Sequence, residues 1–188
     1  VTEALTKVQV QVEERNTEMR SQQRKFDQVL DDQRRNVYAK RQILLFAADA
    51  ELEALCAEWT GESAQAVVDS VTRDDGDDDM LQQRLSQFFN NNLDSPSNID
   101  MAAILAKVGK ARPARSGAKS FAAIALLRLD QLWATHLTNM RDLKDSIQFR
   151  AYESVDPFFA YQKEALQLFQ GFNKKLQTVT TYSLFQTL

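Results

Sequence analysis

No glycine or proline precedes Gly61 in this 188-residue chain. These residues normally end helices and connect strands, so their absence favours one long uninterrupted helix. The apolar pattern agrees, because apolar residues recur every seven positions and at three- and four-residue offsets between them: Leu5, Val12, Met19 and Phe26, joined by Val8, Val29, Leu30, Val37 and Leu44. We predict a helix from Thr2 to Leu45, which at ~1.5 Å per residue would extend on the order of 60 Å.

The predicted helix is longer than a chain of this size needs for its own core, so we expect it to support several neighbours. The alternative is a homodimeric coiled coil. The apolar seam of this helix is too incomplete for pairing with a second copy, because Gln22, Gln33 and Asn36 stand where a self-pairing coiled coil carries apolar residues. The helical pattern is already established at Thr2, and we expect the sequence to be a fragment of a longer chain.

Residues 46 to 120 contain short apolar patches separated by polar runs, which predict several short helices. An acidic run surrounds Gly76 and includes Asp74, Asp75, Asp77, Asp78 and Asp79. It does not match a calcium-binding EF-hand loop, because its carboxylates do not fall at alternating positions and no glutamate closes it. We therefore predict a solvated loop there.

A basic segment with Lys107, Lys110, Arg112, Arg115 and Lys119 ends in the residues Gly117-Ala118-Lys119-Ser120. This ending resembles a phosphate-binding loop only superficially. Such a loop needs glycine immediately before its lysine and again five residues earlier, where this chain has Ala118 and Pro113. We predict that the segment is a linker.

From Phe121 onward the sequence predicts an antiparallel helical hairpin. Its first stripe alternates three- and four-residue steps: Leu126, Leu129, Trp133, His136, Met140, Leu143 and Ile147. Asp156-Pro157 is a helix start signal. The second stripe then follows: Ala165, Phe169, Phe172, Leu176 and Val179. We place the connecting loop between Gln148 and Val155, and the fold class is all-α, with one long helix, a small helical cluster and this hairpin.

Composition and motifs exclude several functions. The 23 basic and 26 acidic residues are mixed along the chain, which gives no general attraction to nucleic acid. Neither a catalytic motif nor a paired-cysteine metal motif occurs. Cys56 is the only cysteine and His136 the only histidine, so we predict no metal site and assign both residues to packing. We find no apolar run of the ~20 residues that would span a bilayer.

Several segments resemble the SecA family of preprotein translocation ATPases. The long helix resembles its scaffold helix through Val12-Glu13-Glu14-Arg15-Asn16, Phe26-Asp27, Asp32-Gln33-Arg34-Arg35, Val37-Tyr38 and Arg41. The segment Leu81-Gln82-Gln83-Arg84-Leu85 is similar to the helical wing domain. Residues 129–137, Arg150-Ala151-Tyr152, Asp156-Pro157 and Tyr161 are similar to the two-helix finger. The resemblance implies a scaffold helix at 1–45, a wing at 46–120, and the finger with the end of the scaffold at 121–188.

The resemblance implies a non-catalytic part of a translocase motor. ATP and magnesium would bind nucleotide-binding domains that this chain lacks, and none would bind here. The implied partners are those domains, a SecY-type channel and unfolded preprotein, without nucleic acid. The implied location is the cytoplasm with peripheral contact to the bacterial inner membrane, or the plastid stroma and thylakoid membrane. The alternative that the residues leave open is a self-contained helical adaptor of another family.

The resemblance also implies roles for individual residues, which sort into three sets. Contacts to the motor domains are assigned to Gln33, Arg34 and Arg35. Contacts to preprotein are assigned to Phe149, Arg150 and Tyr152, and packing of the finger to Trp133, His136, Met140 and Leu143. Ser146 stands where the family commonly has glycine, and Gln148-Phe149 replaces a more usual His-Leu, so the bend near the finger tip is expected to differ.

Overall fold

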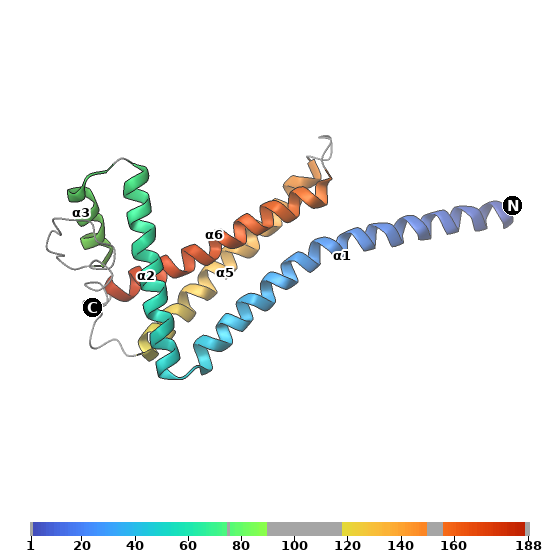
Figure 1. Cartoon of the computed structure of the whole chain (residues 1–188). Helices are drawn as coiled ribbons and strands as arrows, with labels where there is room; N and C mark the ends of the chain where they lie inside the picture. Colours follow the sequence, from blue (N-terminus) through green and yellow to red (C-terminus); the bar gives the residue numbers. More distant parts are fainter. Residues whose placement is uncertain (1, 75, 90–117, 150–155, 187–188) are drawn as a thin grey trace. The chain divides into compact units, whose positions relative to one another are not determined.

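The structure is a computed structural model that describes residues 2–74, 76–89, 118–149 and 156–186. Across these ranges it contains helices and no strand, which confirms the predicted all-α class (Figure 1). The helices are α1 (Thr2–Phe46), α2 (Asp49–Arg73), α3 (Asp78–Phe89), α5 (Ala118–Phe149) and α6 (Pro157–Gln186). The long N-terminal helix was predicted to within one residue of its end.

One prediction needs correction. The patches between 46 and 73 were expected to form separate short helices, but α2 is a single helix of 25 residues. Gly61 lies inside it without ending it. Of the polar residues between the patches, Glu58, Glu62 and Gln65 are exposed, whereas Thr60 and Ser63 are buried. An interior glycine costs a helix only ~1 kcal/mol relative to alanine, which packing of the opposite face can offset. The predicted linker falls mostly outside the described residues.

The chain divides into two compact units that do not follow chain order. Unit 1 comprises Val1–Ala39 and Thr135–Gln170, and unit 2 comprises Lys40–Ala134 and Gly171–Leu188. Three helices, α1, α5 and α6, therefore contribute residues to both units.

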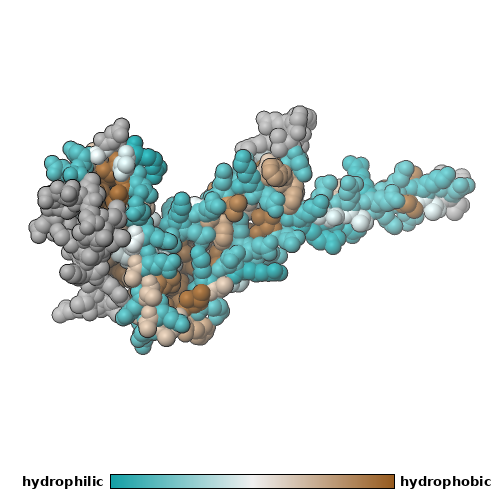
Figure 2. All heavy atoms as spheres, viewed as in Figure 1, coloured by the Kyte–Doolittle hydropathy of each residue, from teal (hydrophilic) through white to brown (hydrophobic). Residues whose placement is uncertain are grey.

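In unit 1, α1 lies antiparallel to α5 and parallel to α6. Asp27 Oδ1 is 2.9 Å from Lys144 Nζ, whereas the later residue Gln33 reaches the earlier residue His136. The core of the unit consists of Met140, Leu143, Ile147, Tyr161 and Ala165, against which α1 packs Phe26, Val29 and Leu30. Residues 5–25 of α1 are exposed, and Figure 2 shows this part of the helix as mostly hydrophilic with isolated hydrophobic side chains.

In unit 2, the end of α6 packs against α2 and α3. Its core cluster consists of Ala64, Val71, Leu81, Leu85, Phe89 and Phe185. The rings of Phe89 and Phe185 meet edge to face with centroids 5.0 Å apart. Elsewhere in the unit the rings of Trp59 and Phe121 meet with centroids 5.5 Å apart.

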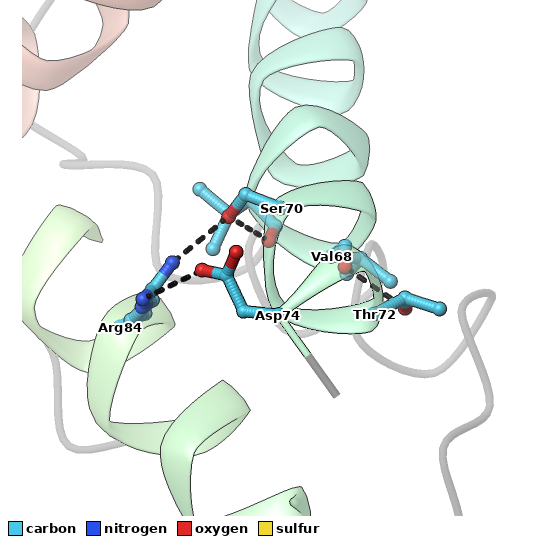
Figure 3. Close-up of polar contacts among 6 residues, drawn as sticks. Val68, Ser70, Thr72, Asp74 and Arg84 are labelled. Carbon is cyan, nitrogen blue, oxygen red and sulfur yellow. Dashed lines mark hydrogen bonds and ion pairs between the residues drawn. The ribbon is translucent and has the colours of Figure 1, made fainter. Parts of the chain in front are cut away.

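The acidic run between α2 and α3 is used for helix contacts. Arg84 of α3 donates to Ser70 Oγ at 3.2 Å and to Asp74 Oδ2 at 3.1 Å, at the end of α2 (Figure 3). Asp77 Oδ1 accepts the backbone N–H of Met80 at 2.9 Å, which caps the first turn of α3. Carboxylates at this helix start also complement its dipole. The predicted solvated loop is therefore shorter than expected, because Asp78 and Asp79 belong to α3.

Gly76 is required by the tight turn between α2 and α3. Its N–H donates to the Val71 carbonyl at 2.9 Å, and an added Cβ would lie 2.6 Å from Val71 Cγ1 and 2.8 Å from Met80 Sδ. Gly76→Ala should therefore lower the free energy of unfolding by ~1–3 kcal/mol through overpacking. Urea denaturation measures this change.

Gly171→Ala provides the matched control, because an added Cβ there meets nothing within 4 Å. Alanine should stabilise that helical position by ~0.5–1 kcal/mol. Equal losses for both substitutions would contradict the assigned role of Gly76.

Candidate functional site

The candidate site is the contact between α1, α5 and α6 in unit 1, where a buried polar pair joins all three helices. The Gln33 side chain is 6% exposed and His136 is 3% exposed. Gln33 Nε2 donates to the backbone carbonyl of Ala165 at 3.1 Å, and Gln33 Oε1 lies 2.8 Å from His136 Nε2. Because the Ala165 carbonyl can only accept, the amide oxygen of Gln33 faces His136, whose Nε2 must carry a proton.

The electrostatics of the pair follow from its burial. Burial disfavours the charged imidazolium and lowers the pKa of His136 below its ordinary value of 6.5. Neutral His136 with hydrogen on Nε2 is therefore the form that matches Gln33. The ring also packs against Phe169, with centroids 5.8 Å apart.

The lowered pKa predicts how stability depends on pH. Between the folded-state pKa and the ordinary value of 6.5, the unfolded chain binds more protons than the folded chain. The free energy of unfolding should therefore be unaffected by this group above pH 6.5 and fall as the pH is lowered below it. Urea denaturation between about pH 7 and pH 5 measures the slope.

His136→Gln is the control, because His136 is the only histidine and the variant has no group left with its ordinary pKa near 6.5. The variant should show a flatter dependence over that range. Identical slopes in the two proteins would show that burial of His136 does not set the pH response.

The residues assigned to finger packing share one face of α5 but divide between the units. His136, Met140 and Leu143 are buried in unit 1. Trp133 belongs to unit 2 and is half-buried, with its ring centroid 6.0 Å from that of Phe172. The seven-residue spacing placed these side chains on one face and could not reveal the division.

The residues assigned to motor-domain contacts lie in different environments. Gln33 is buried among α1, α5 and α6, so we reassign it to a contact inside unit 1. Arg34 is paired with Asp31, and Arg35 Nη1 lies 3.8 Å from Asp32 Oδ1, both within α1. The Arg35 side chain is 82% exposed, which leaves its guanidinium open to a partner.

The residues assigned to preprotein contacts fall at or beyond the last described residue of α5. Phe149 is the last residue of α5, whereas Arg150 and Tyr152 lie outside the described residues. The predicted start of the second helix is confirmed, because α6 begins at Pro157 and Asp156 Oδ1 accepts the N–H of Phe158 at 3.0 Å. Ser146 donates to the Leu143 carbonyl at 2.9 Å, and α5 continues through it without a break.

A groove of about 840 Å³ lies between α5 and α6 on the hairpin of unit 1. Its lining combines apolar side chains with charged ones: Leu143, Ile147, Phe159, Leu168, Asp142, Lys163 and Glu164. In the described ranges, no cluster of three or more His, Cys, Asp or Glu side chains could hold a metal ion. Among the same residues, no helix is both long enough and apolar enough to cross a membrane.

The architecture defines a helical scaffold, in which a long helix is fastened to a helical hairpin by side-chain contacts. The chain belongs to the SecA Wing and Scaffold domain family, whose family model matches residues 1–188. The adaptor of a different family is therefore excluded.

Curated relatives agree with this assignment. Protein translocase subunit SecA of Bartonella henselae is 28% identical over 99% of this chain and 23% of its own length. The protein of the same name from Halothermothrix orenii is 27% identical over 99% of this chain and 24% of its own length. Protein translocase subunit SecA 1 of Magnetococcus marinus is 31% identical over 90% of this chain and 21% of its own length. The chain thus spans about a quarter of the length of the relatives it matches.

Proposed function

We propose that this chain is the scaffold, wing and finger part of a SecA-type motor, which couples ATP-driven domain motion to preprotein movement through a SecY-type channel. The observation that carries the proposal is the family match over residues 1–188. In this proposal the chain itself is not an enzyme. ATP and magnesium would bind nucleotide-binding domains of the same parent protein, with the assembly peripheral on the cytoplasmic face of a membrane.

The form of α1 supports a coupling role. It is one helix of 45 residues without glycine or proline, the residues at which helices most often kink, so it has no built-in hinge that would absorb a shift once a partner covers residues 5–25. Its exposed residues 5–25 can meet another domain. Phe26, Val29 and Leu30 pack against the hairpin of unit 1, and Gln33 is hydrogen-bonded to it. Arg35, with its exposed guanidinium, is the residue we assign to the motor domains.

The tip of the hairpin is assigned to preprotein. Tyr152 is an aromatic residue, and an aromatic ring can press on backbone and on many types of side chain. That property suits a motor that moves unrelated sequences. Arg150 and Phe149 are proposed to share this contact.

The test uses a full-length SecA of a relative in which this chain replaces the corresponding segment. A photoreactive residue at position 152 should label a preprotein stalled in a SecY-type channel, while the same probe at exposed Asp69 of α2 should not. Labelling from position 69 alone would contradict the tip assignment. ATP turnover without any preprotein transport would contradict the coupling role of this chain.

A further inference from the structure

The exposed part of α1 contains a segment whose sequence is typical of a strand. From Lys7 to Glu13 polar and apolar residues alternate strictly, because valine occupies positions 8, 10 and 12 and glutamine occupies positions 9 and 11. Strict alternation is a strand pattern, and β-branched valine is favoured in strands and disfavoured in helices. We call residues 7–13 the alternating segment. Its sequence pattern and its helical structure disagree.

The helix exposes the three valines on different sides, with Val8, Val10 and Val12 exposed by 58%, 48% and 52%. Successive residues of a helix are ~100° apart, so Val10 lies on the side opposite to Val8 and Val12. A partner that packs on one side of the helix therefore cannot cover all three. In a strand, alternate side chains share a face, so the three valines would be buried together. The other face of this strand would be polar: Lys7, Gln9, Gln11 and Glu13.

Little holds the alternating segment in its helical form. Residues 5–25 bury no face in this chain, and helices without tertiary packing are marginal. The ion pair of Lys7 with Glu3 is exposed at both side chains, so it contributes little to stability. Further along α1, by contrast, Phe26 and Val29 pack on the core of unit 1. Conversion of the alternating segment to a strand would therefore leave the core contacts of α1 intact.

The alternating segment is complementary to an antiparallel copy of itself. When two copies pair as strands about Val10, Val8 of one copy lies opposite Val12 of the other. In the same register, Lys7 of each copy lies opposite Glu13 of the other. Cross-strand apolar pairs and opposite charges are both stabilising, whereas parallel pairing would place like charges opposite each other. Charge and hydrophobicity therefore both indicate a second copy of this chain, in antiparallel register, as the partner.

We propose that the alternating segment is a self-association surface, at which copies of this chain pair as antiparallel strands after the segment converts from helix to strand. Two strands of this length are marginal by themselves, so each strand is expected to pair along both edges and build a sheet from several copies. A domain bound to residues 5–25 would hold the helix and prevent this pairing. The proposal goes beyond the coupling function and does not depend on it, because it concerns only copies of this chain.

The test follows the association and the secondary structure of the full chain together, as its concentration is raised into the millimolar range under reducing conditions. Sedimentation velocity measures association, and the amide I infrared band measures strand content. Both signals should rise together, because the described part of the single chain contains no strand. In the associated state the amides of residues 7–13 should exchange with deuterium at least about tenfold more slowly, because strand pairing hydrogen-bonds them.

The decisive variant combines Val10→Gln with Gln11→Val, which keeps both composition and charge. It breaks the alternation and places valine at positions 8, 11 and 12, which share one side of a helix. Association through strands should then require at least about tenfold more chain, whereas association through helices would become stronger. The urea midpoint should stay unchanged, because both substituted positions are exposed.

An exchange of charges tests the antiparallel register. Lys7→Glu places like charges opposite each other and should raise the concentration needed for association about fivefold or more. Adding Glu13→Lys makes the charges opposite again and should restore association. A chain that stays monomeric at millimolar concentration, or associates without a strand signal, would overturn the proposal. Stronger association of the variant with Val10 and Gln11 exchanged would overturn it as well, as would failure of Glu13→Lys to rescue Lys7→Glu.

Discussion

Tyr161→Ala should lower the free energy of unfolding by ~3–5 kcal/mol, the usual cost of removing a large buried aromatic side chain. Tyr161 is 2% exposed and belongs to the core of unit 1 with Met140, Leu143 and Ile147. Its ring centroid is 4.8 Å from that of Phe26, so it also holds α1 on the hairpin. Urea denaturation followed by far-UV circular dichroism measures the loss.

Two substitutions control this prediction. Tyr161→Phe keeps the ring, so most of the packing should survive. Burial and the charge of Asp27 raise the pKa of Tyr161 to about 12, so the side chain is neutral at neutral pH and its removal deletes no charge. Phe159→Ala removes an exposed ring from the same helix and should change stability by no more than ~0.5 kcal/mol. Equal effects of Tyr161→Ala and Phe159→Ala would contradict the burial argument.

Phe89→Ala should lower the free energy of unfolding of unit 2 by a similar amount, ~3–5 kcal/mol. Phe89 is 1% exposed, and its ring meets those of Phe88 and Phe185 with centroids 4.8 Å and 5.0 Å away. The two tryptophans, Trp59 and Trp133, both belong to unit 2, so tryptophan fluorescence follows the unfolding of this unit. Its urea midpoint should fall.

Phe46→Ala is the control for Phe89→Ala, because Phe46 is an exposed aromatic residue of the same unit. Its substitution should leave the fluorescence transition nearly unchanged. A small effect of Phe89→Ala would mean that the cluster between α2, α3 and α6 contributes less to stability than its burial indicates.

The helices whose apolar residues recur at regular helical spacing could be predicted from sequence. The seven-residue spacing from Leu5 to Phe26 predicted α1, and the stripes around Met140 and Phe172 predicted the hairpin. The single helix α2 was missed because Gly61 and the polar residues on its exposed face looked like interruptions. Whether a glycine ends a helix depends on the packing of the rest of that helix, which local sequence does not contain.

The polar pair of the candidate site was only half visible in the sequence. Gln33 stood out as a polar residue on an apolar seam, which is the signal that a buried polar contact leaves. Its partners are 103 and 132 residues away, so no local spacing connected them. His136 was correctly placed on the hairpin seam, but its bond to α1 depends on which face of the hairpin α1 covers.

The exposed N-terminal half of α1 has a thermodynamic consequence for docking. Residues 5–25 lack a buried face in this chain, so their helicity rests on intrinsic propensity and on local pairs such as that of Lys7 with Glu3. Helical segments of this kind are marginal without tertiary packing. Backbone amides of residues 5–25 should therefore exchange with deuterium faster than those of residues 27–37. A domain that binds residues 5–25 would also have to order this part of the helix. The measured binding free energy would therefore include the free energy of completing the helix.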